Sequence, residues 1–466
     1  MAVPDALDRL AAELGPAFTG DPAALAEYRT DKSGWTTPET PLGAVRARST
    51  EDVQAAMRIA SEHGIPVVPR GAGTGLAGGA VGTAGTLVVD VAAMDRVLEI
   101  HAADELAIVQ PGVVTDDLAA TLAPHGLWWP PDPASRAIST VGGNIATNAG
   151  GLLCAKYGVT RESVLALAVV LADGTLVRTG HRTVKGVTGY DLTALLIGSE
   201  GTLGVVVEAT LKLRRRSADS VITVGAGFPT VVEAAAAAAA ITAAGIRCAA
   251  LELLDAASCV AIDAYLADVP GMPSLAGRGA FLLVQTDGAA AAEEGRAVVR
   301  LIEAAGGVPE LAADEAEGER LLQVRRSAHP AFERLGQVLI EDVAVPRTRL
   351  PAMFAAIERI SAEYGLPIPT VAHAGDGNLH PNLVIPPGLA HEPGTYPDVV
   401  WEAAEAMFRT AIELGGTLTG EHGVGVLKRR WLEDELGPEV TALSRRIKAA
   451  FDPQGILNPG KVFLDA

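Results

Sequence analysis

The chain has 466 residues, of which 49% are hydrophobic and 20% charged, the balance of a globular protein rather than of a disordered one. Its formal net charge of −19 at pH 7 argues against nucleic acid or an anionic membrane as the main partner, because both attract surplus lysine and arginine. Its three cysteines lie far apart without a CxxC spacing, which disfavours a disulfide scaffold, a cysteine-type zinc site and an iron–sulfur cluster.

The first twenty residues read as an acidic amphipathic helix that begins near Pro4. They lack the basic region, the apolar stretch and the small-residue cleavage site of a signal peptide. No apolar run in the chain approaches the roughly 20 residues that span a bilayer. A soluble, cytoplasmic protein is therefore expected.

The first third of the chain predicts short, valine-rich strands that alternate with helices. A helix is expected over residues 51–63, with Ser49 or Thr50 as its N-cap. Strands are expected at residues 66–69, 87–90, 107–110, 164–171 and 205–213.

From about residue 217 to residue 365 the composition becomes richer in alanine and glutamate, and residues 214–217 are the expected linker. A domain of helices and a mostly antiparallel sheet is the natural reading of that region. Its helices are predicted at residues 230–244, 291–305 and 351–364, and its strands at 281–285 and 339–345. A last helix is expected over residues 441–451.

Three glycine-rich tracts punctuate the first half of the chain, at residues 70–79, 130–151 and 198–204. Consecutive small residues let backbone N–H groups converge on an anion such as a pyrophosphate, and Arg70 adds positive charge. Residues 73–78 match GxGxxG, but no helix follows them, so a Rossmann site is not expected. Together the tracts suit one long ligand, with the third closing over a ring system.

The strings PRGAGTGLAGG, PPDPASRAISTVGGNIATNAGG and GSEGTLGVVVEATLKL resemble the FAD-binding domain of the vanillyl-alcohol-oxidase/PCMH flavoprotein family, over about residues 38–216. Members with covalent flavin often carry a histidine where Thr74 stands, so the resemblance implies non-covalent FAD. The cofactor-binding residues that it implies are Arg70, Gly71, Ala72, Gly73, Thr74, Gly75, Pro131, Asp132, Ser139, Thr140, Gly143, Asn148, Gly150, Gly204 and Val205.

A histidine constellation occupies the last quarter of the chain. In HAGDGNLHPN, a hairpin with Asp376-Gly377 as its loop would pair His373 with His380, with Cβ atoms about 5 Å apart and Asn382 on the same face. Glu421 and His422 stand between glycines that free the backbone to aim both side chains into one cavity. Two histidines and one glutamate make a three-ligand site for Zn²⁺ first, with Mn²⁺, Fe²⁺ and Co²⁺ as alternatives.

The strings HAGDGNLHPN, TGEHGVGVLK and FDPQGILNPGKVF resemble the carboxy-terminal region of FAD-linked D-2-hydroxyacid dehydrogenases, the group with D-lactate dehydrogenases, the glycolate oxidase flavin subunit and D-2-hydroxyglutarate dehydrogenase. Dicarboxylate-using relatives carry a lysine just before a strand aspartate, where Ile340-Glu341-Asp342 stands here, which weakens a hydroxyglutarate substrate. The resemblance implies His373, His380 and Glu421 as metal ligands, His422 as catalytic base, and Arg325, His329 and Asn382 as substrate-binding residues.

The expected fold class is α+β, with a PCMH-type FAD-binding domain, an α/β substrate (cap) domain with an antiparallel sheet, and a C-terminal helical segment. The last segment is expected to carry Glu421 and His422 and to pack back on the FAD domain. The expected boundaries are a helical segment at 1–37, the FAD domain at 38–216, the substrate domain at 217–415 and the C-terminal segment at 416–466.

These features predict oxidation of a small D-2-hydroxy acid, D-lactate or glycolate first, to the 2-keto acid by hydride transfer to flavin N5, with D-2-hydroxyglutarate as an alternative. A metallohydrolase whose glycine tracts are only structural, and a non-catalytic flavin subunit that relays electrons, are the competing classes. A separate acceptor is expected: a quinone, a cytochrome, an electron-transfer flavoprotein or an iron–sulfur subunit. A homodimer, and peripheral association with the inner membrane through a partner, stay open.

Overall fold

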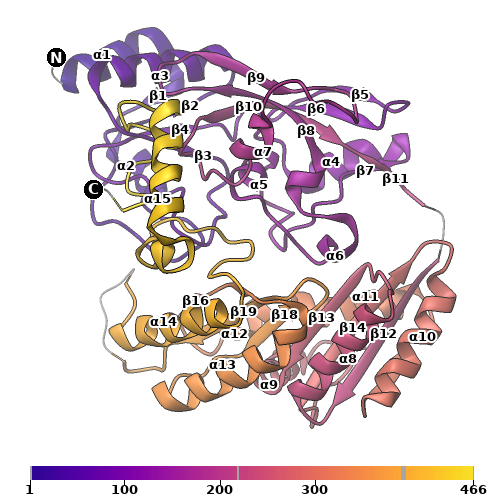
Figure 1. Ribbon diagram of the computed structural model, residues 1–466. Coiled ribbons are helices and arrows are strands. Elements are labelled where there is room, and N and C mark those ends of the chain that lie inside the picture. Colours follow the sequence, from indigo (N-terminus) through magenta and orange to yellow (C-terminus); the bar gives the residue numbers. More distant parts are fainter. Residues whose placement is uncertain (1–2, 218–219, 390–394, 465–466) are drawn as a thin grey trace. The chain divides into compact units, whose positions relative to one another are not determined.

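The computed structural model describes residues 3–217, 220–389 and 395–464, and it divides into two compact units (Figure 1). Unit 1 comprises residues 1–150, 158–216 and 421–466, and unit 2 comprises residues 151–157 and 217–420. Unit 2 is thus an insertion within the chain of unit 1. The short stretch 151–157, inside the expected range of the FAD domain, groups with unit 2. The first two residues of the expected N-terminal segment lie outside the described ranges.

The first sheet of unit 1 is mostly parallel and lies against two helices, α1 (Val3–Leu14) and α3 (Thr50–His63). Helix α3 begins with a capping box in which Ser49 accepts the N–H of Asp52, so Ser49 rather than Thr50 is the cap. In sheet order the strands are β1 (Phe18–Thr19), β2 (Gly43–Arg46), β4 (Leu87–Asp90) and β3 (Val67–Arg70), and α2 (Pro22–Leu25) follows β1 in the chain.

The second sheet of unit 1 is antiparallel (Figure 1). The side chains of one of its faces join those of short helices in a common apolar core. In sheet order its strands are β5 (Val97–His101), β6 (Leu106–Val109), β10 (Val205–Lys212), β8 (Val164–Val170) and β9 (Leu176–Gly180). The helices are α4 (Thr115–Leu122), α5 (Val141–Thr147) and α7 (Leu192–Leu196), and β7 (Leu127–Trp128) pairs with β11 (Arg214–Arg215).

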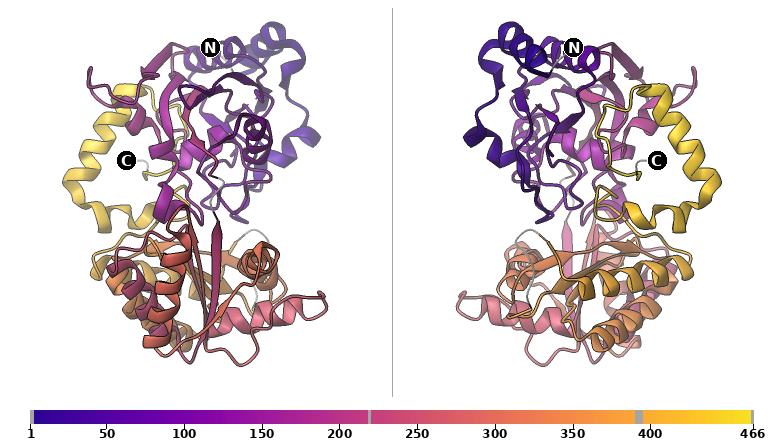
Figure 2. Two further views of the ribbon diagram at one scale, coloured as in Figure 1. Left: turned by 90° about the vertical axis from the view of Figure 1, so that its right-hand side faces the viewer. Right: turned by 90° about the vertical axis from the view of Figure 1, so that its left-hand side faces the viewer.

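The C-terminal segment completes unit 1. Helix α15 (Leu432–Phe451) is kinked where Gly437, at φ 72°, precedes Pro438, and Figure 2 shows it in yellow along the side of unit 1. Beyond the helix, the chain pairs with β3, since the N–H of Val67 donates to Ile456 and that of Asn458 donates to Val67. Within the described ranges, no helix combines the length and the apolar character needed to cross a membrane.

Unit 2 is built on an antiparallel sheet with helices on both faces. Leu254, Phe281 and Leu283 point to the face covered by α9, α11 and α12, whereas α8, α10 and α13 pack on the opposite face. In sheet order the strands are β15 (Val308–Leu311), β12 (Val221–Phe228), β14 (Ala280–Asp287), β13 (Ala250–Asp255), β18 (Thr370–His373), β19 (Asn378–Val384) and β16 (Val338–Ile340), and β17 (Val343–Ala344) also pairs with β19. The helices are α6 (Cys154–Tyr157), α8 (Val231–Ala243), α9 (Ala256–Leu266), α10 (Ala291–Ala304), α11 (Glu315–Arg326), α12 (Ala328–Glu333), α13 (Leu350–Tyr364) and α14 (Asp398–Glu413).

The hairpin between β18 and β19 forms, but its predicted register was wrong. His373 lies opposite Asn378, and His380 lies opposite Val371. The loop is longer than a two-residue turn: Gly377 adopts φ 93°, donates its N–H to the carbonyl of His373 and accepts that of Val345. The shift is by an even number of residues, so both histidines still share one face, with ring centroids 5.0 Å apart.

Candidate functional site

The first glycine tract of unit 1 follows β3 and is packed against the second. A Cβ atom at Gly71 would lie 2.6 Å from the Oγ1 atom of Thr140, so only glycine permits this approach. Gly73 adopts φ 67°, and a side chain there would clash with the guanidinium of Arg70. The structure thus brings together two tracts that are about seventy residues apart in the chain.

Arg70, expected to add charge beside a pyrophosphate, is turned toward the protein backbone. Its Nη1 atom donates to the carbonyls of Thr30 and Ala80, each at 2.9 Å, and its guanidinium lies 5.4 Å from the ring of Tyr28. The side chain therefore ties the two ends of the first tract to the segment before β2. Its contact with a pyrophosphate stays a prediction.

In the second tract the polar side chains also serve the local backbone. Thr140 caps α5 by accepting the N–H of Gly143 at 3.2 Å, and Ser139 lies buried beside Thr115. Asn148 ends α5 with φ 52° and accepts the N–H of Arg161. These side chains fix the course of the chain, and phosphate binding by its backbone N–H groups stays a prediction. Of the other expected members of the tract, Pro131 and Gly150 are buried and Asp132 is partly buried.

The third tract contains a buried carboxylate that the sequence analysis missed. Glu200, at φ 51°, accepts the N–H of Val424 and of Gly425, both at 2.8 Å. Burial raises the pKa of Glu200, against the opposing effect of these hydrogen bonds and of nearby lysines. Gly204 has no room for a side chain beside Val169. A lone glutamate within a glycine tract was the one signal for it.

Residues near the end of the chain close the network around these tracts. The Nζ atom of Lys461 donates to the carbonyls of Gly79 at 3.2 Å and Val81 at 2.9 Å. The Nδ2 atom of Asn458 donates to Gly79 at 3.0 Å and to Glu200 at 2.8 Å. Burial lowers the pKa of Lys461 to about 8, although the charges of Asp31 and Glu200 oppose the shift. The first and third tracts are thus fixed by one C-terminal motif.

The histidine site of unit 2 begins with a buried triad. The Nδ1 atom of His373 lies 2.8 Å from Oε1 of Glu252, and the Nε atom of Arg325 donates to Oε2 of Glu252 at 2.8 Å. Burial alone would raise the pKa of Glu252, but the charges of His373 and Arg325 and their hydrogen bonds lower it below its usual value. Glu252 was not among the predicted site residues, because a single glutamate in a strand carries no motif.

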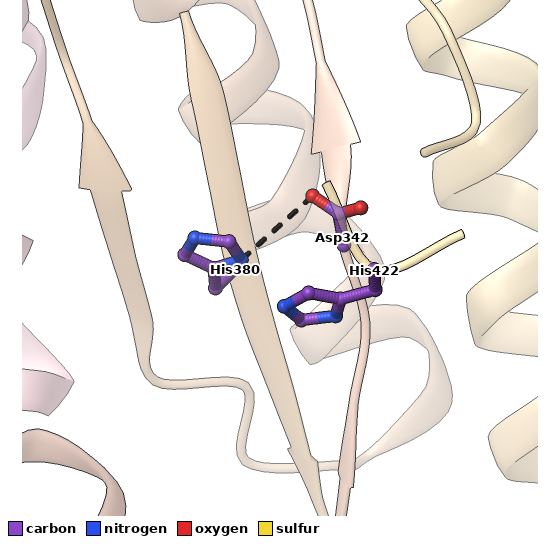
Figure 3. A group of neighbouring side chains, drawn as sticks. All are labelled: Asp342, His380 and His422. Carbon is purple, nitrogen blue, oxygen red and sulfur yellow. Dashed lines mark ion pairs between the residues drawn. The ribbon is translucent and has the colours of Figure 1, made fainter. Parts of the chain in front are cut away.

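A second buried carboxylate, Asp342, organises the other side of this site. Its Oδ1 atom accepts the Nδ2 donor of Asn378 at 2.5 Å and lies 3.8 Å from Nδ1 of His380 (Figure 3). Its Oδ2 atom accepts the hydroxyl of Thr419 at 2.7 Å and the N–H of Gly420 at 2.8 Å. The chain is therefore fixed at the residue directly before Glu421.

Glu421 and His422 follow this anchor directly in the chain. Within unit 2, the predicted metal ligands His373 and His380 have ring centroids 5.0 Å apart. Both oxygens of Asp342 already accept hydrogen bonds, which makes Asp342 a poorer cation ligand than the two imidazoles. Two imidazoles and one carboxylate suit a divalent metal such as Zn²⁺, and Glu421 as the third ligand stays a prediction.

The predicted substrate-binding residues occupy three different environments. Arg325, on α11, is buried and is linked to His373 through Glu252. Asn382, on β19, is also buried, and its amide donates to the carbonyls of Pro369 and His380. His329, on α12, is exposed and lies 3.2 Å from a carboxylate oxygen of Glu333. The structure therefore joins Arg325 and Asn382 to the histidine site but gives His329 no part in it.

Comparisons with known proteins match both regions of the chain. Residues 41–180 match the family described as FAD binding domain, and residues 218–462 match the one described as FAD linked oxidases, C-terminal domain. The chain is 43% identical to the glycolate oxidase subunit GlcD of Bacillus subtilis, over 91% of this chain and 89% of that one. It is 36% identical to a D-lactate dehydrogenase of Archaeoglobus fulgidus, over 90% of each.

Among solved structures, p-cresol methylhydroxylase with bound substrate has a similar fold. The TM-score is 0.75, and the match covers 99% of this chain and 97% of the other at 18% sequence identity. At that identity the likeness concerns the fold alone. It confirms the α+β, PCMH-type architecture predicted from the glycine tracts.

Proposed function

Because the chain belongs to the family of FAD-linked oxidases that includes glycolate oxidase subunit GlcD and D-lactate dehydrogenase, and is therefore a FAD-linked oxidoreductase, we propose that it oxidises a small D-2-hydroxy acid to the 2-keto acid. D-Lactate and glycolate are the first candidates. The observation that carries this proposal is the buried group on one face of the unit 2 sheet, where the histidine pair His373 and His380 lies beside the Glu252–Arg325 ion pair. A 2-hydroxy acid offers the matching groups: a hydroxyl and a carboxylate.

The cofactors divide the chemistry between them. Non-covalent FAD, held by the glycine tracts, would supply the oxidising power as a hydride acceptor at N5. A divalent cation, with zinc as the first choice, would be held by His373, His380 and Glu421 and would lower the pKa of the substrate hydroxyl.

The side chains of this group then have distinct tasks. Arg325 offers a permanent positive charge to the substrate carboxylate, and since its Nε atom is bonded to Glu252, its Nη1 and Nη2 atoms would face the substrate. His422, as a neutral imidazole, would accept the hydroxyl proton as the general base. Gly423, at φ 85°, follows His422 directly and allows the sharp turn that the backbone makes there.

An anaerobic visible spectrum tests the proposal. We expect a flavin band near ~450 nm that is bleached by D-lactate or by glycolate. Bleaching by D-2-hydroxyglutarate instead would move the substrate to a dicarboxylate. A stable band with all three acids would favour a subunit that only relays electrons, and a protein without a band after incubation with FAD would favour a metallohydrolase.

We also propose that electrons leave to a separate acceptor. The three cysteines, Cys154, Cys248 and Cys259, stand without the CxxC spacings that hold an iron–sulfur cluster. The acceptor would be a quinone, a cytochrome, an electron-transfer flavoprotein or an iron–sulfur subunit. Reoxidation of the bleached protein by each acceptor class would identify it.

A further inference from the structure

Glu252 joins two groups to which the proposed function gives separate tasks. It lies on β13 with an exposed fraction of 0%, and its carboxylate contacts the proposed metal ligand His373 and the proposed substrate-binding Arg325. A carboxylate so deeply buried is strongly disfavoured unless charged partners compensate for the lost water. Here both partners are residues of the site. The side chain therefore acts on the site as well as on the fold.

The contact with His373 determines which ring nitrogen carries the proton. Both Glu252 oxygens lie close to Nδ1 of His373, at 2.8 and 2.9 Å. A carboxylate beside Nδ1 favours the tautomer with the proton on Nδ1, which gives Nε2 the lone pair that a metal ligand needs. The same contact fixes the plane of the ring.

The contact with Arg325 fixes the guanidinium in the same way. A bond through Nε sets the direction of the planar group, so that its remaining donors form a fixed fork that suits a carboxylate. The His373 and Arg325 side chains come from different elements, β18 and α11, and Glu252 is their common partner.

We propose that Glu252 is a positioning residue that couples metal binding to substrate-carboxylate recognition, by setting the tautomer of His373 and the orientation of Arg325 together. The inference rests on the proposed function, since it takes the metal and the hydroxy acid from there. It adds that loss of one buried side chain weakens both interactions.

Zn²⁺ affinity, measured by competition with a chromophoric chelator, is the direct test. Glu252→Gln keeps the size of the side chain, and we expect a 10–100-fold weaker zinc affinity, the usual effect of losing such a partner. Glu252→Gln should also raise KM for D-lactate more than it lowers kcat. In a His373→Ala background, the same substitution should leave the residual zinc affinity unchanged.

Asp255→Asn is the matched control. Asp255 lies on the same strand and is buried, but it accepts the N–H groups of Ser258 and Thr370 and contacts neither His373 nor Arg325. The Asp255→Asn protein should bind zinc as tightly as the unmodified protein. Equal zinc affinity and KM in Glu252→Gln would overturn the inference. Failure of the unmodified protein to bind zinc would instead refute the metal part of the proposed function.

A measurement on the unmodified protein covers the case in which Glu252→Gln does not fold. ¹⁵N-histidine NMR of the metal-free protein, with His373 assigned through His373→Gln, reports the tautomer directly. We expect the Nδ1-protonated form. The Nε2-protonated form would overturn the inference.

Discussion

The two units build their sites from different parts of the polypeptide. In unit 1, polar side chains of the glycine tracts form hydrogen bonds with the protein backbone, as Arg70 and Thr140 do. In unit 2, side chains hold side chains, as Glu252 holds His373 and Arg325. Backbone sites depend on glycine conformation, whereas side-chain sites depend on partners distant in sequence. Substitutions should therefore damage the two sites in different ways.

The largest effect is expected from His422→Ala. Removal of the proposed base should lower kcat by about 10²–10⁴-fold, the usual contribution of general base catalysis, while the protein keeps its FAD. Turnover with D-lactate and the flavin content of the purified protein measure the two parts. His329→Ala is the control, because this histidine is exposed and pairs with Glu333. A fully active His422→Ala protein would show that His422 is not the general base. A raised KM in the His329→Ala protein would support the predicted role of His329 in substrate binding.

Gly425→Ala tests whether the site of unit 1 depends on the backbone conformation of a glycine. Gly425 adopts φ 48°, and a Cβ atom there would clash with the carbonyl of Ala77. We expect loss of bound FAD and a free energy of unfolding lower by more than about 1–3 kcal/mol, since strain and a steric clash add. Gly455→Ala is the control: its φ is 67°, but nothing lies within 4 Å of a Cβ there, so only about 1 kcal/mol of strain is expected. Equal flavin content in the two variants would contradict the prediction.

Glu200→Gln should have a smaller effect, on the loop that carries His422. The side-chain oxygen of a glutamine can still accept one of the N–H groups of Val424 and Gly425. Its NH₂ group would face the other N–H group, and two donors cannot form a hydrogen bond. We expect a loss of about 1–3 kcal/mol in the free energy of unfolding and a lower kcat, because the loop is less firmly held. Thermal unfolding and turnover are the measurements, with Glu208→Gln on β10 as the control. Unchanged values would show that the loop is held without this carboxylate.

The last effect is confined to stability and appears only as the pH changes. Burial raises the pKa of Asp255 from 3.8 to about 6, so the folded protein binds a proton there more readily than the unfolded chain. Relative to Asp255→Asn, the unmodified protein should gain up to about 3 kcal/mol of stability as the pH falls from 7 to 4, and lose it as the pH rises through 6. Urea unfolding of both proteins at several pH values measures this difference. A difference that does not vary with pH would contradict it.

Local patterns predicted most of the regular structure. The expected strand at residues 87–90 is β4 as predicted, and the helix over 51–63 begins at the expected cap. Strand β13 was not predicted, because Glu252 and Asp255 give it the appearance of a surface segment although the whole strand is buried. The hairpin register was wrong because the loop is longer than predicted, and its Gly377 accepts the N–H of Val345, a residue outside the hairpin motif.

The same limit applies to the sites. Motifs pointed to His373 and His380, whose ring centroids lie 5.0 Å apart, and the comparisons confirmed the FAD-linked family. The residues that hold those groups, Glu252 and Asp342, carry no motif, because their role arises from partners far along the chain. Arg70 shows the converse: its position was predictable, but the direction of its side chain was not.

The insertion of unit 2 into the chain of unit 1 also determines the order in which the two units can fold during synthesis on the ribosome. Lys461 bonds to Gly79, which precedes it by 382 residues. At a synthesis rate of 5–20 residues per second, the first glycine tract waits about 20–80 s for this partner. Residues 217–420 are synthesised before then, so unit 2 can fold while unit 1 still lacks its C-terminal residues. We expect stable FAD capture only after residue 461 has left the exit tunnel.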